Sequence, residues 1–145
     1  MRFVSDKEIL HKECKRCDSV HEGRLVGEKL IEVLKQNRSQ RGLAANQVGI
    51  DLAVCVVYVR NPIVLINPKI NNKFGKSFFQ EGCLSFPGDY IFTERWTNIT
   101  VSCDNHLKEL SFSFQKDPLE CVYIQHEIDH LHGITMFDRA ANMEI

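Results

Sequence analysis

Two histidines near the end of the sequence, His126 and His130, have the spacing of a metal-binding pair, and Glu127 follows the first. Residues four apart on an α-helix share one face, about 5–6 Å apart at Cβ, so both imidazoles can reach one ion. Glu127 lies about 100° around the helix axis, beside the ion rather than on it. There a carboxylate can act as a general base toward an activated water. The alternative is two core histidines bonded to backbone and a solvated glutamate.

A catalytic metal usually has three protein ligands and one open position, so a third ligand is needed. Downstream of His130 the candidates are His132, Met136, Asp138 and Glu144. A thioether is a poor ligand for Zn²⁺ or Fe²⁺, and the histidine two positions along faces another side of the helix. Upstream, Cys83 follows a glycine in the polar stretch 81–85. Its thiolate would complete a site of two histidines and one cysteine.

The other five cysteines give no comparable signal. Cys14 and Cys17 form a CxxC pair without the second pair that a structural zinc site needs, so we expect a surface pair without function. Cys55 lies in an apolar run and is expected to be a small buried hydrophobe, and Cys103 and Cys121 are interpreted in the same way. In a protein without an export signal the thiols are expected to stay reduced.

The helix that carries the two histidines has clear start and stop signals. Asp117 is an N-cap residue, Pro118 fits the first helical position, and Gly133 is a stop signal. The residues between are apolar on nearly all sides, which is typical of a helix in the middle of a fold. Polar side chains inside such a helix therefore need partners.

Other elements follow from periodicity. We expect an amphipathic helix over 23–36, strands over 52–59 and 62–68, a turn at 71–73, and a hairpin of strands 99–103 and 109–114 joined at 104–106. The chain has 145 residues, 43% hydrophobic and 26% charged, without repeats or linkers, so a single domain over 1–145 is expected. A net charge of -1 does not favour nucleic acid or an anionic membrane as partner. No membrane span or signal peptide is recognised, so we expect a cytoplasmic protein.

Three segments, taken in order, resemble the motifs of the peptide deformylase family. They are QRGLAANQ at 40–47, EGCLS at 81–85 and HEIDH at 126–130, and the resemblance covers about residues 25–137. The family removes the N-formyl group from the formylmethionine of new proteins and releases formate. The resemblance implies an α+β fold, in which antiparallel sheets surround the HExxH helix and an N-terminal helix is added.

The resemblance also implies roles for individual residues. Cys83, His126 and His130 would bind one divalent metal, natively Fe²⁺, with Zn²⁺, Ni²⁺ or Co²⁺ as other occupants. Glu127 would be the general base and later the acid. The oxyanion would be stabilised by the Gln47 side chain and the Leu84 backbone N–H. An ion pair between Glu81 and Arg95 would support the metal loop. The residues that would bind the substrate are Arg41, Gly42, Gly82, Tyr90, Val122 and Tyr123.

The implied partner is an N-formylmethionyl peptide, with transient ribosome contact, and the protein is expected to be a monomer in a bacterial or phage-infected cytoplasm. Three positions depart from the common pattern: Gln40 replaces a glycine, Arg41 an apolar residue and Tyr90 an arginine. The short C-terminal part is similar to the forms encoded by phages. These departures affect fine specificity.

Two other functions are compatible with part of the pattern. A zinc peptidase would use the HExxH helix but leave the stretch 81–85 unexplained. A non-catalytic, metal-stabilised binding module would need a fourth ligand, and His132 and Cys121 are the candidates near the pair.

Overall fold

The computed structural model describes residues 3–141 and has an α+β architecture with two three-stranded antiparallel sheets. The first sheet has the order β1-β2-β3 and the second β4-β5-β6. The helices are α1 (Lys7–Leu10), α2 (Val20–Lys35) and α3 (Pro118–Leu131), with 3-10 turns η1 (Ala45–Val48) and η2 (Met136–Arg139). The strands are β1 (Gly42–Ala44), β2 (Val54–Tyr58), β3 (Pro62–Ile66), β4 (Lys69–Glu81), β5 (Ile91–Cys103) and β6 (His106–Ser113).

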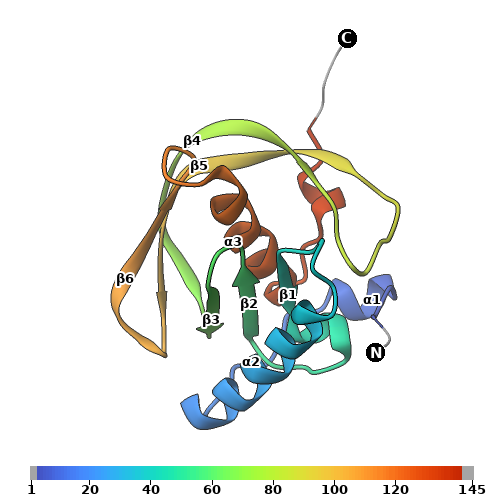
Figure 1. Cartoon of the computed structure of the whole chain (residues 1–145), viewed down its shortest axis with the longest axis vertical. Helices are drawn as coiled ribbons and strands as arrows, with labels where there is room; N and C mark the ends of the chain where they lie inside the picture. Colours follow the sequence, from blue (N-terminus) through green and yellow to red (C-terminus); the bar gives the residue numbers. More distant parts are fainter. Residues whose placement is uncertain (1–2, 142–145) are drawn as a thin grey trace.

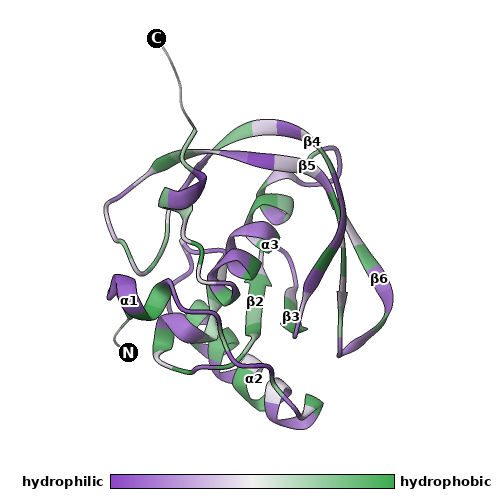
Figure 2. Cartoon of the chain, turned by 180° about the vertical axis from the view of Figure 1, so that it is seen from behind, coloured by the Kyte–Doolittle hydropathy of each residue, from purple (hydrophilic) through white to green (hydrophobic). Residues whose placement is uncertain are grey.

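Helix α3 lies between the two sheets, as predicted (Figure 1). It packs against β1 and β2 on one side and against β5 and β6 on the other, while β4 and β5 arch over it. In Figure 2, hydrophilic residues are visible along this central helix, beside the hydrophobic strands β2 and β3. Every residue of α3 from Cys121 to Leu131 is buried. The polar ones are therefore held by partners inside the fold.

Strand β2 is buried on both faces of the first sheet, which explains why it is apolar without alternation. Val54 and Val56 belong to the core under α2, whereas Cys55 and Val57 belong to the core under α3. The predicted strands 52–59 and 62–68 are both confirmed, and both are shorter than predicted. Helix α2 begins three residues earlier than predicted, because the Ser19 side chain accepts a hydrogen bond from the backbone N–H of Glu22.

The second sheet is built on a ribbon that the sequence predicted only in part. Strand β4 pairs with β5 from Lys69↔Ser102 to Glu81↔Ile91, so the predicted turn at 71–73 is wrong. A bulge between Ile70 and Asn72 absorbs the polar residues that suggested it. The predicted hairpin at 104–106 is confirmed, because Cys103 pairs with His106. Glu81 ends β4, and the loop that follows carries Cys83.

The ends of α3 are as predicted. The Asp117 side chain accepts from the backbone N–H of Glu120 at 3.2 Å, and Pro118 occupies the first turn. Gly133 follows with a positive φ of 76°, and a Cβ there would lie 2.7 Å from the His11 carbonyl carbon. Glycine is therefore required for both conformation and packing. Among residues 3–141, no helix is long and apolar enough to cross a membrane.

Candidate metal centre and active site

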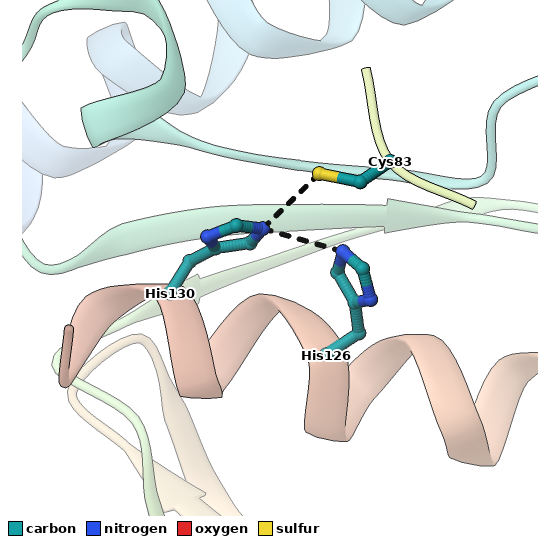
Figure 3. Close-up of side chains that lie close together, drawn as sticks. All are labelled: Cys83, His126 and His130. Carbon is teal, nitrogen blue, oxygen red and sulfur yellow. Dashed lines mark hydrogen bonds between the residues drawn. The ribbon is translucent and has the colours of Figure 1, made fainter. Parts of the chain in front are cut away.

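Cys83, His126 and His130 form a buried group of three potential metal ligands (Figure 3). The two histidines extend from one face of α3, and the cysteine reaches them from the loop after β4. The sulfur lies 3.4 Å from His130 Nε2, which lies 3.2 Å from His126 Nε2. Each residue offers one ligand atom, and these atoms all lie within 4.8 Å of one another. One small cation can therefore be shared by all three.

A carboxylate fixes the ring of His126. His126 Nδ1 lies 2.7 Å from Glu81 Oε1. Burial alone would raise the pKa of Glu81, but hydrogen bonds from Arg95 and His126 lower it to about 2. Because an ionised carboxylate only accepts hydrogen bonds, the proton must be on Nδ1. The nitrogen left to bind a metal is therefore Nε2, which lies 3.2 Å from His130 Nε2 inside the group.

The second histidine is also suited to bind a cation. Burial, together with the nearby His126, lowers the pKa of His130 well below its usual value, so the ring is neutral. The backbone carbonyl of His130 accepts a hydrogen bond of 2.8 Å from the Asn46 side chain, which ties α3 to η1. Two imidazole nitrogens and a cysteine sulfur are borderline-soft donors that suit Zn²⁺ or Fe²⁺. The residues present therefore fit the divalent metal that the sequence predicts.

Glu127 lies beside this group without belonging to it. Its Oε2 is 3.9 Å from His126 Nε2, and the residue is 1% exposed. Among the described residues, no hydrogen-bond partner satisfies Oε1. Burial raises the pKa of Glu127 to about 7, since its charged form is poorly solvated. A carboxyl group with this pKa can both take and return a proton near neutral pH.

Gln47, in η1, contacts the cysteine. Its Oε1 accepts from the backbone N–H of Ala44 at 2.9 Å, which directs the amide NH₂ group toward the site. That group donates to Cys83 Sγ at 3.3 Å and to Ser85 Oγ at 3.2 Å. Within residues 3–141, the backbone N–H of Leu84 donates to no protein acceptor. Both predicted oxyanion donors are thus next to the cysteine, and the Gln47 amide is held in a fixed orientation.

The predicted substrate-binding residues divide into two groups. Gly42 lies against Glu127, and Gly82 exchanges hydrogen bonds with the Tyr123 hydroxyl at 3.2 and 3.3 Å. The Tyr123 ring is 5.2 Å from that of His126, while Val122 is fully buried next to it in α3. Tyr90 is 68% exposed, and its ring would contact a Cβ placed on Gly82.

Arg41 is in a different place from the rest of these residues. It lines a hollow of about 100 Å³ with Leu34, Tyr58 and Arg60, at the end of α2. None of these residues belongs to the Cys83 group. The backbone of Arg41 adjoins Gly42, so a role of Arg41 in substrate binding stays a prediction.

Several residues that support the site were missed by the sequence analysis. Arg95 binds Glu81 through Nε and Nη2 at 2.6 and 2.7 Å, as predicted, but its Nη1 also binds Asp129 Oδ2 at 2.6 Å. Thr93 donates to Glu81, and Arg139 binds both oxygens of Asp129. The signal in the sequence was Asp129 itself, a charged residue inside an apolar helix. Its partners lie on β5 and η2, too far along the chain to be recognised.

The remaining cysteines and histidines do not complete the group. His132 caps α3 and is close to Glu13, at 3.7 Å, while the Cys121 sulfur approaches the Trp96 carbonyl at 3.7 Å. Neither residue is in the cluster of potential ligands found among the described residues. Cys17 is buried, so the prediction that Cys14 and Cys17 are both on the surface is wrong. The Cys17 thiol donates to the Ser19 carbonyl at the start of α2.

An α+β fold that buries two histidines, a cysteine and a glutamate together has the make-up of a metal-dependent hydrolase. Sequence comparison is more specific: the polypeptide deformylase family matches residues 3–145, and the chain belongs to this family. A peptide deformylase of Aquifex aeolicus is 41% identical over 106 residues, which cover 68% of this chain and 62% of that protein.

Solved structures show the same similarity across the chain. The peptide deformylase of Thermotoga maritima has a TM-score of 0.85 and 30% identity, covering 97% of this chain and 96% of that one. The peptide deformylase of Synechococcus elongatus, solved in complex with actinonin, matches with a TM-score of 0.84 and 33% identity. The match covers 98% of this chain and 78% of that one. The predicted fold class is confirmed by these likenesses, with two antiparallel sheets and three helices.

Proposed function

We propose that this protein is a peptide deformylase, which hydrolyses the N-formyl group of N-terminal formylmethionine and releases formate. One observation supports this most strongly. A carboxylate with an unpartnered oxygen, Glu127, lies beside three converging ligand atoms, and an amide donor held by the backbone, Gln47, contacts Cys83. Membership of the family supports the same reaction. We propose further that residues 1–145 form a single catalytic domain.

Cys83, His126 and His130 would hold the metal. When bound, a divalent ion supplies Lewis acidity, which lowers the pKa of a water molecule toward ~7 and polarises the formyl oxygen. Glu81 keeps the His126 ring in the ligand tautomer, and Arg95 and Thr93 keep Glu81 in place. Fe²⁺ as the native metal stays a prediction, and metal analysis of anaerobically prepared protein tests it.

Glu127 would move the protons of the reaction. It takes a proton from the water that adds to the formyl carbon, and the carbonyl oxygen becomes negatively charged. The Gln47 amide and the Leu84 N–H are donors for that charge, and loss of one such donor typically costs ~10²–10³ in rate. Glu127 then gives its proton to the amine nitrogen as the C–N bond breaks. Formate and a free N-terminus are the products.

Substrate binding would use the backbone near Gly42 and Gly82. Glycine lets a peptide approach closely, and an extended peptide can add to strand edges through backbone hydrogen bonds. We propose that Val122 and Tyr123 line the position of the methionine side chain and that Tyr90 contacts the peptide from the loop. A monomer, transient ribosome contact and a cytoplasmic location also stay predictions from the resemblance.

The test is a formyl-Met-peptide assay that measures both formate and the length of the peptide. We expect formate release with the chain intact, and loss of turnover in Glu127→Ala while the metal stays bound. Cleavage of an internal peptide bond would instead indicate a zinc peptidase. A metal-loaded protein that releases no formate would indicate the binding module.

A further inference from the structure

The predicted Glu81–Arg95 ion pair is part of a longer chain of ion pairs that reaches the surface of the molecule. Arg95 is 3% exposed and Glu81 0%, and Arg95 also binds Asp129, whose side chain is 10% exposed. The carboxylate of Asp129 is in turn bound by Arg139, through Nε and Nη2, both at 3.1 Å. Arg139 is the last residue of η2, and its side chain is 44% exposed. Four charges of alternating sign therefore lead from solvent to His126.

The segment that carries Arg139 is attached to the same strand as Arg95. Ala140 forms a β-bridge with Thr93, and the backbone N–H of Ala141 donates to the Phe92 carbonyl at 2.7 Å. Met136, at the other end of η2, is 1% exposed. The guanidinium of Arg139 is thus held against Asp129 by backbone contacts on one side and by core packing on the other.

We propose that Arg139 is a positioning residue for the metal centre, acting through Asp129 and Arg95; this rests on the proposed function. Arg95 lies between two carboxylates, and a buried charge needs a partner. While Arg139 binds Asp129, the Arg95 fork stays on Glu81, and Glu81 stays 2.7 Å from His126 Nδ1. Without Arg139, Asp129 has only Arg95 as its cation and draws it away from Glu81. The Glu81 carboxylate is then held less firmly against His126.

Two physical effects of removing Arg139 have opposite signs, which makes the proposal testable. Removing a positive charge near the site favours cation binding through long-range attraction. Loosening Glu81 disfavours it, because groups that orient metal ligands typically contribute ~10–100-fold in metal affinity or activity. Arg139 is half-exposed, so water replaces part of its bonding to Asp129, and we expect an effect near the lower limit. If Arg139 acts by positioning, its removal should weaken metal binding. If it acts only through its charge, its removal should tighten metal binding.

The experiment titrates the metal-free protein with Co²⁺ and follows the thiolate–Co²⁺ absorption. We expect Arg139→Ala to raise the dissociation constant about 10-fold and to lower kcat with KM unchanged, since Arg139 touches none of the proposed substrate-binding residues. Arg139→Lys keeps the charge and should recover part of the affinity. A Lys variant no better than Ala, or an Ala variant that binds Co²⁺ as tightly as the parent or more so, overturns the proposal.

The matched control is Arg60→Ala. Arg60 binds the carboxylate of Asp117, the N-cap of α3, at 2.9 Å, so it also forms an arginine–aspartate pair, but at the start of the helix. Its Co²⁺ affinity should equal that of the parent, and an equal loss in both variants would overturn the proposal in favour of general destabilisation. An inactive parent whose Co²⁺ affinity still falls in Arg139→Ala contradicts the proposed function alone. An active parent with unchanged affinity in the variant contradicts this inference alone.

Discussion

Replacing Gly42 by alanine tests whether the placement of Glu127 limits the reaction. Gly42 is in β1, opposite Val57, and its backbone packs directly on the Glu127 side chain. A Cβ at this position would lie 2.8 Å from Glu127 Cγ and 2.9 Å from Cδ. Since Glu127 is 1% exposed, its side chain cannot yield to the methyl group by turning out into solvent. The added methyl group must therefore displace the carboxylate or the strand.

The size of the effect follows from these distances. Ordinary carbon contacts begin at 3.4 Å, so the atoms must separate by at least 3.4 − 2.8 = 0.6 Å. Overpacking of this kind costs about 1–3 kcal/mol of stability. A displacement of about 1 Å in a reacting group can cost ~10² in rate, so we expect kcat to fall about 10-fold or more. The metal content should not change, because the three atoms nearest to the added methyl group all belong to Glu127 and none to a metal ligand.

Gly27→Ala is a control with a similar clash far from the site. A Cβ on Gly27 would lie 2.7 Å from Val64 Cγ1, between α2 and β3. Alanine in a helix gains about 0.5–1 kcal/mol over glycine, which offsets part of the strain. Both variants, Gly42→Ala and Gly27→Ala, are compared by the rate of formate release at saturating substrate and by their melting temperatures. The reasoning is refuted if Gly42→Ala keeps the parental kcat, or if both variants lose kcat equally.

Three further predictions concern single residues around the site. Gln47→Ala should lower kcat ~10²–10³-fold with little change in KM, measured by formate release, because one oxyanion donor is lost. The pKa of Glu81 is lowered from 4.5 to about 2, so its stabilisation is complete above pH 4.5 and is lost as the pH falls toward 2. Unfolding free energies over this range should fall less steeply in Glu81→Gln. Arg95→Leu should cost about 3–5 kcal/mol in urea unfolding, because Glu81 and Asp129 stay buried without their cation, and Arg95→Leu/Glu81→Gln should recover part of it.

The elements that the sequence predicted well have local causes. Helix α3 was recognised from Asp117, Pro118 and Gly133, since an N-cap, a first-turn proline and a positive-φ glycine each act within one turn. The convergence of Cys83 on the two histidines was inferred from ligand chemistry and then from motif order. Composition and periodicity alone contain no information on a contact between residues 83 and 130.

The features that sequence reasoning missed depend on contacts across the fold. The polar run at 71–73 resembles a turn, but pairing with β5 keeps it in β4 and a bulge takes up the extra residue. Arg139 pairs with Asp129 only because η2 returns to β5, which places Ala140 next to Thr93. No periodicity marks such a return. The role of Arg41 in substrate binding was taken from the resemblance and stays a prediction.

The polar side chains of α3 show how stability and reactivity are separated in this fold. Gln125 binds the backbone of Trp96 at 3.0 and 2.8 Å, His126 binds Glu81, and Asp129 binds Arg95. Buried polar groups are nearly always paired in this way, because each unpaired one costs about 1–3 kcal/mol. Among the described residues of α3, the exceptions are His130 Nδ1 and Glu127 Oε1. A carboxylate oxygen without a protein donor keeps both lone pairs for the water of the proposed reaction, and Glu127 Oε1 is such an oxygen.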